Sequence, residues 1–416
     1  MKALRVAMIV NKPEREDLIL ERIAQALRRI NPACATLRVE YRDPAFFERV
    51  TQFEPTVILT FPLTARGIAA RFYALKYALD CRIVSYRTEG QISLSDTNYS
   101  DWMVGFDEYG PNLVEWELFW GDLSAQVVGE CLVSQNKLAD AGRARAVGYP
   151  RYETYFDAVE RSGETEAELR FLELARGRPR ERVAFFISGF CIAEYSVEDM
   201  LRGGDVFPNR DPRPEEVLQA LAAVEKCRDF RDRWIDATLA VADLDPELLV
   251  VFKSHPVENI IFARQGNNPY DRLRGRDNVL YIDTPVGIDL ILRRSGLFFH
   301  YGSTVAAESY IAGTPCLFTT AFDLYPEDKV PENPCFYFHD LGWPASAKLD
   351  IADVPDFVRR HLENPVRFER TERMSWVLDR VFAIRDAHLD GRSRYSPSQE
   401  IAAFLAASAA TPMLDP

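Results

Sequence analysis

Short apolar runs alternate with longer helix-prone segments along most of this chain of 416 residues. Runs of about four to eight apolar residues bounded by polar segments are typical of strands, and apolar residues every three or four positions are typical of helices. Strands that alternate with helices form a parallel sheet whose faces the helices cover. The alternation comes in two series, so the sequence predicts an α/β fold with two Rossmann-like domains.

The first series lies in the N-terminal part of the chain. Its expected strands are residues 4–10, 36–39, 57–60 and 82–86, and its expected helices are residues 16–30 and 65–79. The second series has expected strands at residues 183–188, 248–253, 279–282, 297–301 and 316–319. Further helices are expected at residues 164–175, 214–241, 354–362, 370–387 and 398–407.

A polar, strongly charged segment separates the two series. Residues 160–182 are helix-prone and are punctuated by Gly177 and Pro179, which is typical of a boundary between domains. We therefore expect an N-terminal domain at 1–158, a linker at 159–182 and a C-terminal domain at 183–390. The last segment, 391–416, is expected to be a helix and tail that packs back on the N-terminal domain.

Composition narrows the class of protein. The length suits two domains, and 47% hydrophobic with 27% charged residues is typical of a soluble globular protein. Seven cysteines without any CxxC spacing favour a reducing cytoplasm and argue against a disulfide framework or structural zinc. A net charge of −13 argues against nucleic acid as a partner, because phosphate backbones are bound mainly by Lys and Arg.

Polar residues follow a predicted buried strand at Lys253-Ser254-His255-Pro256. Pro256 disfavours helical geometry at His255, so the turn aims Lys253 and His255 into the crevice at the carboxyl end of the sheet. A lysine and an imidazole there can neutralise a phosphate that leaves with its charge. The alternative is a histidine that satisfies a backbone carbonyl in a turn.

A second group of small polar residues follows the strand at 297–301. Gly302, Ser303 and Thr304 precede a short helix that ends at Gly313. Small residues, hydroxyls and the free N–H groups of a helix N-terminus favour an anion such as phosphate. The alternative for either hydroxyl is ordinary N-capping.

Glu308 lies about one turn into that helix among apolar neighbours. An unpaired charge in a buried helix is costly, so the sequence favours a role in which this carboxylate accepts from both hydroxyls of a ribose. An exposed surface glutamate is the alternative. The chain has no GxGxxG after its first strand and no GxxxxGK[ST], so neither a dinucleotide site nor a P-loop is predicted.

The N-terminal series has its own candidate acid. Glu89 and Gly90 follow the strand at 82–86, and an acid next to a glycine can act on a substrate as a base or as a nucleophile. The alternative is a turn residue paired with Arg87 or Arg82. The aromatic residues Trp102 and Trp120, which lie among acids, are weaker candidates for an acceptor surface, since aromatics also fill cores.

Several short motifs, taken in their order along residues 1–320, resemble the bacterial surface carbohydrate biosynthesis proteins. This family is similar to the wider group of GT-B glycosyltransferases that includes bacterial sialyltransferases, β-Kdo transferases and CDP-glycerol polymerases. The motifs are Arg87-Thr88-Glu89-Gly90, Phe119-Trp120-Gly121, Val147-Gly148-Tyr149-Pro150-Arg151, Phe186-Ile187-Ser188-Gly189-Phe190, Lys253-Ser254-His255-Pro256 and the segment 302–315.

The resemblance implies roles for the matching positions. His255 and Pro256 correspond to the His-Pro pair that engages the donor phosphate, and Ser303 with Thr304 corresponds to the serine-bearing loop that binds the phosphate of CMP. Thr88-Glu89-Gly90 corresponds to an acid-acid-Gly motif that supplies the base, with threonine in place of the first acid. Two sheets facing a central cleft, an acceptor domain followed by a donor domain, are implied as well.

We therefore expect a metal-independent GT-B glycosyltransferase without a cofactor. The catalytic residues are Glu89 and His255. The donor-binding residues are Lys253, His255, Pro256, Gly302, Ser303, Thr304, Glu308 and Ser188, and the acceptor-binding residues are Arg87, Trp102 and Trp120.

The expected donor is a nucleotide-sugar, with CMP-Kdo or a related CMP-ulosonate leading, and the expected acceptor is a surface polysaccharide or glycolipid. No nucleic acid is expected as a partner. The expected location is the cytoplasm, with peripheral association to the inner membrane or an assembly complex. The rival functions are a UDP-sugar 2-epimerase and a non-catalytic nucleotide-sugar-binding protein of a glycan assembly complex.

Overall fold

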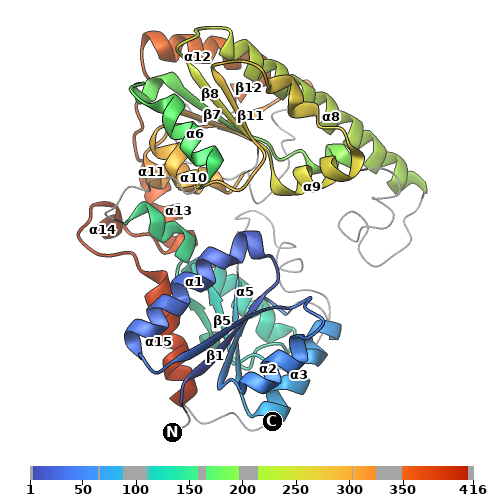
Figure 1. Cartoon of the computed structure of the whole chain (residues 1–416), viewed down its shortest axis with the longest axis vertical. Helices are drawn as coiled ribbons and strands as arrows, with labels where there is room; N and C mark the ends of the chain where they lie inside the picture. Colours follow the sequence, from blue (N-terminus) through green and yellow to red (C-terminus); the bar gives the residue numbers. More distant parts are fainter. Residues whose placement is uncertain are drawn as a thin grey trace. The chain divides into compact units, whose positions relative to one another are not determined.

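The computed structural model describes residues 3–63, 66–87, 110, 112–157, 165–195, 214–301, 303–324 and 349–410. The chain divides into two compact units. The first comprises Met1–Ala158 together with Ser375–Pro416, and the second comprises Val159–Met374. Figure 1 shows a sheet covered by helices in each unit.

The described part of the first unit contains a six-stranded parallel sheet in the order β2-β1-β3-β4-β5-β6. The central strands β1, β3, β4 and β5 are almost entirely buried, as continuous apolar runs in parallel sheets usually are, whereas the edge strands β2 and β6 are partly exposed. The strands are β1 (Arg5–Val10), β2 (Ala35–Glu40), β3 (Val57–Thr60), β4 (Arg82–Tyr86), β5 (Trp116–Phe119) and β6 (Ala144–Ala146). The helices and 3-10 turns are α1 (Pro13–Ile30), α2 (Phe46–Phe53), α3 (Arg66–Leu79), α5 (Asp122–Ser134), η1 (Ala141–Arg143), η2 (Pro150–Tyr155), α13 (Glu372–Phe382), α14 (Asp386–Leu389) and α15 (Pro397–Ala410).

Helices from both ends of the chain complete the first unit. Helix α15 packs against α1, β3 and β4, and Figure 1 shows α1 and α15 beside each other. Helices α2 and α3 cover the opposite face, where Phe46 and Phe72 enter the same apolar cluster as Ile58 and Ile83. The first unit therefore also includes residues 375–390, which the sequence analysis placed in the C-terminal domain.

The described part of the second unit contains another six-stranded parallel sheet, in the order β12-β11-β10-β7-β8-β9. The strands are β7 (Val183–Ile187), β8 (Leu249–Lys253), β9 (Val279–Ile282), β10 (Leu297–His300), β11 (Cys316–Thr320) and β12 (Leu349–Asp350). The helices and turns are α6 (Glu166–Ala175), η3 (Arg180–Arg182), η4 (Cys191–Glu194), α8 (Pro214–Ala242), α9 (Pro256–Gln265), η5 (Pro269–Leu273), α10 (Ile288–Arg293), α11 (Val305–Ala312), η8 (Ile351–Asp353) and α12 (Val354–Glu363).

The connections of this second sheet reverse direction in its middle. From β7 the chain adds β8 and β9 on one side, and it then crosses to β10 and adds β11 and β12 on the other. Figure 1 shows α8 and α12 on one side of the sheet and α10 and α11 on the other. This is the doubly wound arrangement of a Rossmann fold. The prediction of an α/β fold with two Rossmann-like domains is confirmed.

Two segments differ from the sequence expectations. Residues 159–182, expected to be a linker, belong to the second unit, where Phe171 of α6 is fully buried and Gly287 N–H donates to Glu168 at 2.7 Å. The single helix expected at 370–387 is two helices, α13 and α14, because the chain turns left-handed at Ala383 with φ of 55°. None of the helices in the described ranges is both long and apolar enough to cross a bilayer.

Candidate functional site

Three neighbouring strands of the second sheet end beside the residues that the sequence analysis assigned to a donor. Strands β10, β7 and β8 are adjacent and parallel, so their carboxyl ends lie at one edge. Ser188 follows β7, His255 follows β8, and Ser303 follows β10. The pair β10 and β7 is also where the strand order reverses, which is the usual ligand-binding position in open α/β sheets.

The loops after β7 and β10 pack closely on each other. A side chain at Gly189 would meet the carbonyl oxygen of Tyr301 at 3.7 Å, so the two backbones run side by side. The rings of Phe190 and Tyr301 are stacked with their centroids 6.0 Å apart. The contacts bring the two loops together at the strand reversal.

A buried carboxylate, that of Glu258, joins the loops after β7 and β8. Its Oε2 accepts from the hydroxyl of Ser188 and from the backbone N–H of His255, the latter at 2.9 Å. Its Oε1 accepts from the backbone N–H of Phe190 at 2.6 Å and from the hydroxyl of Tyr270 at 2.9 Å. Each oxygen therefore has two donors, and the residue is 0% exposed.

The local sequence explains why α9 begins where it does. His255 is the N-cap, Pro256 occupies the first turn where no N–H is needed, and Glu258 sits at the third position of a capping box. The helix ends at Gly266, which adopts φ of 68° as a left-handed C-cap. The His-Pro pair is thus also a helix start signal.

The ring of His255 is held through one nitrogen. Its Nδ1 accepts from the backbone N–H of Val257 at 3.2 Å and lies 3.4 Å from Sγ of Cys191. Burial raises the pKa of the Cys191 thiol well above its ordinary value, so the sulfur keeps its proton. Because Nδ1 accepts from Val257 N–H, the neutral imidazole carries its proton at Nε2.

Lys253 is the last residue of β8 and is 7% exposed. Its ammonium donates to the backbone carbonyl of Ser254 at 3.0 Å. Lys253 therefore places a positive charge at the edge of the sheet, and little of the lysine surface is exposed to solvent.

The loop after β10 is positioned by a second histidine. The ring of His300 is 1% exposed and stacks on Phe298 with the centroids 5.4 Å apart. Its Nδ1 accepts from the backbone N–H of Ser303 at 3.1 Å, and the hydroxyl of Ser303 accepts from Val305 N–H at 3.2 Å. Ser303 therefore performs the local N-terminal capping that the sequence analysis left open as the alternative. His300 therefore orients this loop.

Thr304 and Glu308 lie on one face of α11, four residues apart. Thr304 is the N-cap residue, and its hydroxyl makes no capping bond within the described chain. Glu308 is 5% exposed, which agrees with the buried helix inferred from its apolar neighbours. The pair places a hydroxyl at the helix N-terminus and a carboxylate one turn beyond it.

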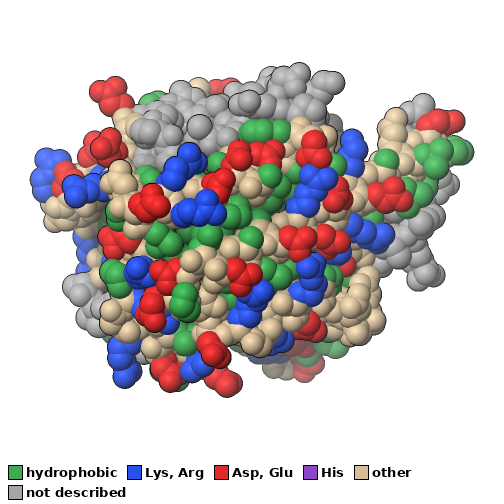
Figure 2. Space-filling model, turned by 90° about the horizontal axis from the view of Figure 1, so that it is seen from above, with side chains coloured by type: hydrophobic (Ala, Val, Ile, Leu, Met, Phe, Trp, Pro, Cys, Tyr) green, Lys and Arg blue, Asp and Glu red, His purple; other side chains and the backbone are tan. Residues whose placement is uncertain are grey.

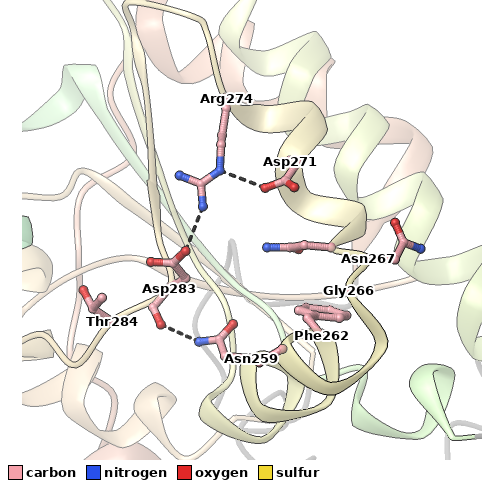
Figure 3. Close-up of a pocket in the computed structure, with 10 residues that line it drawn as sticks. Asn259, Phe262, Gly266, Asn267, Asp271, Arg274, Asp283 and Thr284 are labelled. Atoms are coloured by element: carbon pink, nitrogen blue, oxygen red, sulfur yellow. Dashed lines mark hydrogen bonds and ion pairs between the residues drawn. The ribbon is translucent and has the colours of Figure 1, made fainter.

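A surface cavity of about 550 Å³ adjoins this site (Figure 3). Its lining includes Asn259, whose Oδ1 accepts from the Ser254 hydroxyl at 2.6 Å and whose amide donates to the Asp283 carbonyl at 2.6 Å. Figure 3 shows Arg274 between Asp271 and Asp283, to which it donates at 2.8 and 2.7 Å. Two carboxylates surround one guanidinium, so the cavity does not favour phosphate and suits an uncharged polar group.

The acceptor-side candidates lie in the first unit. Arg87 is 2% exposed, with its Nε 3.5 Å from Oε2 of Glu117, and its carbonyl accepts from Trp120 Nε1 at 2.6 Å. The Trp120 ring is 3% exposed and stacks on Tyr149 with the centroids 4.0 Å apart. The Trp120 ring therefore lies in the core of the first unit, which is the alternative that the sequence analysis gave for these aromatic residues. Glu89, Trp102 and Gly302 fall outside the described residues.

The sequence analysis did not single out Glu258, Tyr270 or Cys191. Glu258 had a recognisable signal, because it stands three residues after the N-cap histidine, which is the capping-box spacing. Tyr270 and Cys191 had none, since they reach the site only through the tertiary fold.

Comparisons with known proteins identify the fold. No family model matches the sequence, and no curated protein matches it either. Among solved structures, the Methanocaldococcus jannaschii UDP-GlcNAc 2-epimerase in complex with UDP-GlcNAc and UDP aligns with a TM-score of 0.50 at 11% identity, covering 97% of this chain and 100% of that one. The S. aureus MnaA structure with UDP gives 0.50 at 11% identity, with 99% of each chain covered.

The wall teichoic acid polymerase TagF aligns with a TM-score of 0.56 at 12% identity, covering 98% of this chain and 89% of that one. Identities this low show a shared fold and no more. The chain has the GT-B fold, with one Rossmann-like sheet in each of its two units.

Proposed function

We propose that this chain is a glycosyltransferase that takes its sugar from a nucleotide-sugar donor. The observation that supports this most is the meeting of the loops after β7, β8 and β10 at the strand reversal of the second sheet. They bring an imidazole N–H, a lysine charge and the N-terminus of α11 to one edge. These are groups that stabilise a phosphate.

In the proposed reaction the bond between the anomeric carbon and the donor phosphate oxygen breaks, and the acceptor oxygen bonds to that carbon. His255 and Lys253 stabilise the negative charge that departs on the phosphate, and Ser303 with Thr304 binds its oxygens. Glu308 holds the ribose. Glu89 takes the proton of the acceptor hydroxyl, or attacks the anomeric carbon in a two-step route.

The leading donor is CMP-Kdo or a related CMP-ulosonate, and the leading acceptor is a surface polysaccharide or glycolipid. This choice is supported by the motif order of the sequence. On the face shown in Figure 2, acidic and basic side chains are intermixed without a continuous patch of one sign. This agrees with a carbohydrate substrate, because binding a carbohydrate requires no extended basic surface. We place the reaction in the cytoplasm, with peripheral association to the inner membrane or an assembly complex.

Nucleotide binding is the first test of this proposal. We expect CMP, CDP or UDP to raise the melting temperature of the intact chain, because a ligand that binds the native state stabilises it by mass action. Calorimetry then gives the affinity, and His255→Ala should lower it by about tenfold, the value of one lost hydrogen bond to a charged group. If none of the three nucleotides binds, the transferase proposal is wrong.

The rate of sugar transfer tests the proposed catalytic role of Glu89. Glu89→Gln should leave donor affinity unchanged and reduce sugar transfer by about a hundredfold or more, because it removes a general base or a nucleophile. A folded Glu89→Gln variant with the wild-type rate of sugar transfer would exclude Glu89 as a catalytic residue.

A UDP-sugar 2-epimerase is the second candidate, because the M. jannaschii UDP-GlcNAc 2-epimerase shares the fold over nearly the whole chain. An epimerase needs an acid and base set but no acceptor. Incubation with UDP-GlcNAc alone, followed by NMR of the sugar, separates the two functions. Formation of a new sugar without acceptor would favour the epimerase.

A further inference from the structure

We propose that Glu258 is a positioning residue, which fixes the His255 ring as the tautomer that donates from Nε2. The proposal rests on the proposed function, because His255 is there the group that meets the donor phosphate. Glu258 itself touches neither donor nor acceptor in this proposal. It acts through the backbone of His255.

The charge of Glu258 is balanced by neutral partners. The groups that favour its ionised form are the Ser188 and Tyr270 hydroxyls and the backbone N–H groups of His255 and Phe190. Burial outweighs them and raises the pKa of this carboxyl. A buried carboxylate whose hydrogen-bond partners are neutral is an expensive way to stabilise a fold, so its value lies in the geometry that it imposes.

The position of the Glu258 carboxylate is determined because each of its oxygens accepts two hydrogen bonds. Oε2 accepts from the Ser188 hydroxyl and from the His255 N–H, and the same His255 N–H lies 2.9 Å from the Ser188 hydroxyl oxygen. Oε1 accepts from Phe190 N–H and from the Tyr270 hydroxyl. The backbone at His255 is thus tied to the loop after β7 and to η5 through a single side chain.

The His255 ring is held at Nδ1. The backbone N–H of Val257 donates to Nδ1 at 3.2 Å, and Sγ of Cys191 lies 3.4 Å from the same nitrogen. Because Nδ1 accepts from Val257 N–H, the neutral ring carries its proton on Nε2. Glu258 accepts the backbone N–H of His255 in the same capping box, so it fixes the turn in which Val257 N–H reaches Nδ1.

A second buried glutamate provides a matched control. Glu168 of α6 is 1% exposed, also occupies the third position of a capping box, and also accepts a backbone N–H from another loop, that of Gly287. Its carboxylate accepts from the backbone N–H groups of Thr165 and Gly287, which belong to other loops than the one that carries His255. Glu258→Gln and Glu168→Gln therefore change the same chemistry at two places.

The experiment uses the full chain with 15N-labelled histidine. The chain has five histidines, so the His255 ring signals can be assigned by their loss in His255→Gln. We expect wild type and Glu168→Gln to show a pure Nε2–H tautomer at His255 and equal affinity for CMP or UDP within about twofold. In Glu258→Gln we expect a mixture of tautomers and a loss of affinity of about tenfold or more.

Unchanged tautomer and unchanged affinity in folded Glu258→Gln would overturn the proposal. If that variant does not fold, Ser188→Ala provides the test, because it removes one of the two acceptors of His255 N–H and one of the two donors to Oε2. The proposal requires the tautomer to shift in part in this variant, and an unchanged tautomer would overturn it. If wild type binds no nucleotide, the proposed function fails while the NMR spectrum alone still decides the positioning role.

Discussion

Glu258 illustrates at the residue scale how burial and hydrogen bonding oppose each other. Four neutral donors favour its ionised form, whereas the loss of solvent disfavours it, and the loss of solvent is the larger effect. The Glu258 side chain is therefore held by four hydrogen bonds, each of which contributes modestly. A change at any donor leaves the carboxylate partly unsatisfied.

This balance predicts a pH dependence of stability. A carboxyl whose folded-state pKa is raised above its ordinary 4.5 stabilises the fold most below that pH, and the contribution is lost as pH rises through the folded-state pKa. We expect the free energy of unfolding of wild type, relative to Glu258→Gln, to decline from pH 4.5 upward. Urea denaturation of both proteins at pH values from about 4 to about 8 measures the difference. A difference that grows with pH would contradict the raised pKa.

At the element scale the close contact of α5 and α13 depends on one glycine. A side chain at Gly121, the N-cap of α5, would lie 2.5 Å from the carbonyl oxygens of Arg380 and Val381. Backbone atoms cannot rotate away as the end of a side chain can. The contact explains how α13, far along the chain, joins the first unit.

Gly121→Ala should therefore lower the free energy of unfolding by about 3 kcal/mol or more. Gly67→Ala is the matched control, because Gly67 lies in α3 with no atom within 4 Å of an added side chain. It should change stability by less than about 1 kcal/mol, in the stabilising direction. Equal effects of the two substitutions in chemical denaturation would show that the close approach is not maintained.

The longest helix and several buried strands were predictable, and some of the shorter helices were not. The helix α8 (Pro214–Ala242) and strands β3, β4 and β9 agree with the expected ranges to within a residue. Helices α2 and α9 were missed because a helix of eight to ten residues shows few turns from which to establish a period. The break at Ala383 was missed because alanine is a strong helix former. The turn there is held by Ile384 N–H, which donates to the Leu378 carbonyl at 2.8 Å, and by the Tyr395 hydroxyl, which donates to the Phe382 carbonyl at 3.1 Å.

At the scale of the whole molecule, the chain returns to its first unit after completing the second. Leu405 of α15 and Leu292 of α10 are both 0% exposed, one in each unit. Truncating either leucine removes buried apolar contacts and leaves a cavity. The two substitutions therefore report on different units.

Leu405→Ala should destabilise the unit that contains the N-terminus, and Leu292→Ala should destabilise the other, each by about 2–5 kcal/mol. Hydrogen exchange resolved by peptide separates the two, since protection should fall in β1–β4 for the first variant and in β7–β11 for the second. Loss of protection in β7–β11 alone after Leu405→Ala would refute the assignment of α15 to the first unit.

The sequence by itself determined that there are two parallel sheets, most of their strands, and the residues that follow those strands. Periodicity and residue order are local properties, and the end of a buried strand can be read from them, as at Lys253 and His255. Only the tertiary structure decided that β10, β7 and β8 lie side by side, that Cys191 lies beside the His255 ring and that Tyr270 donates to Glu258. Strand order and contacts of this kind join residues far apart in the chain, so a local pattern does not record them.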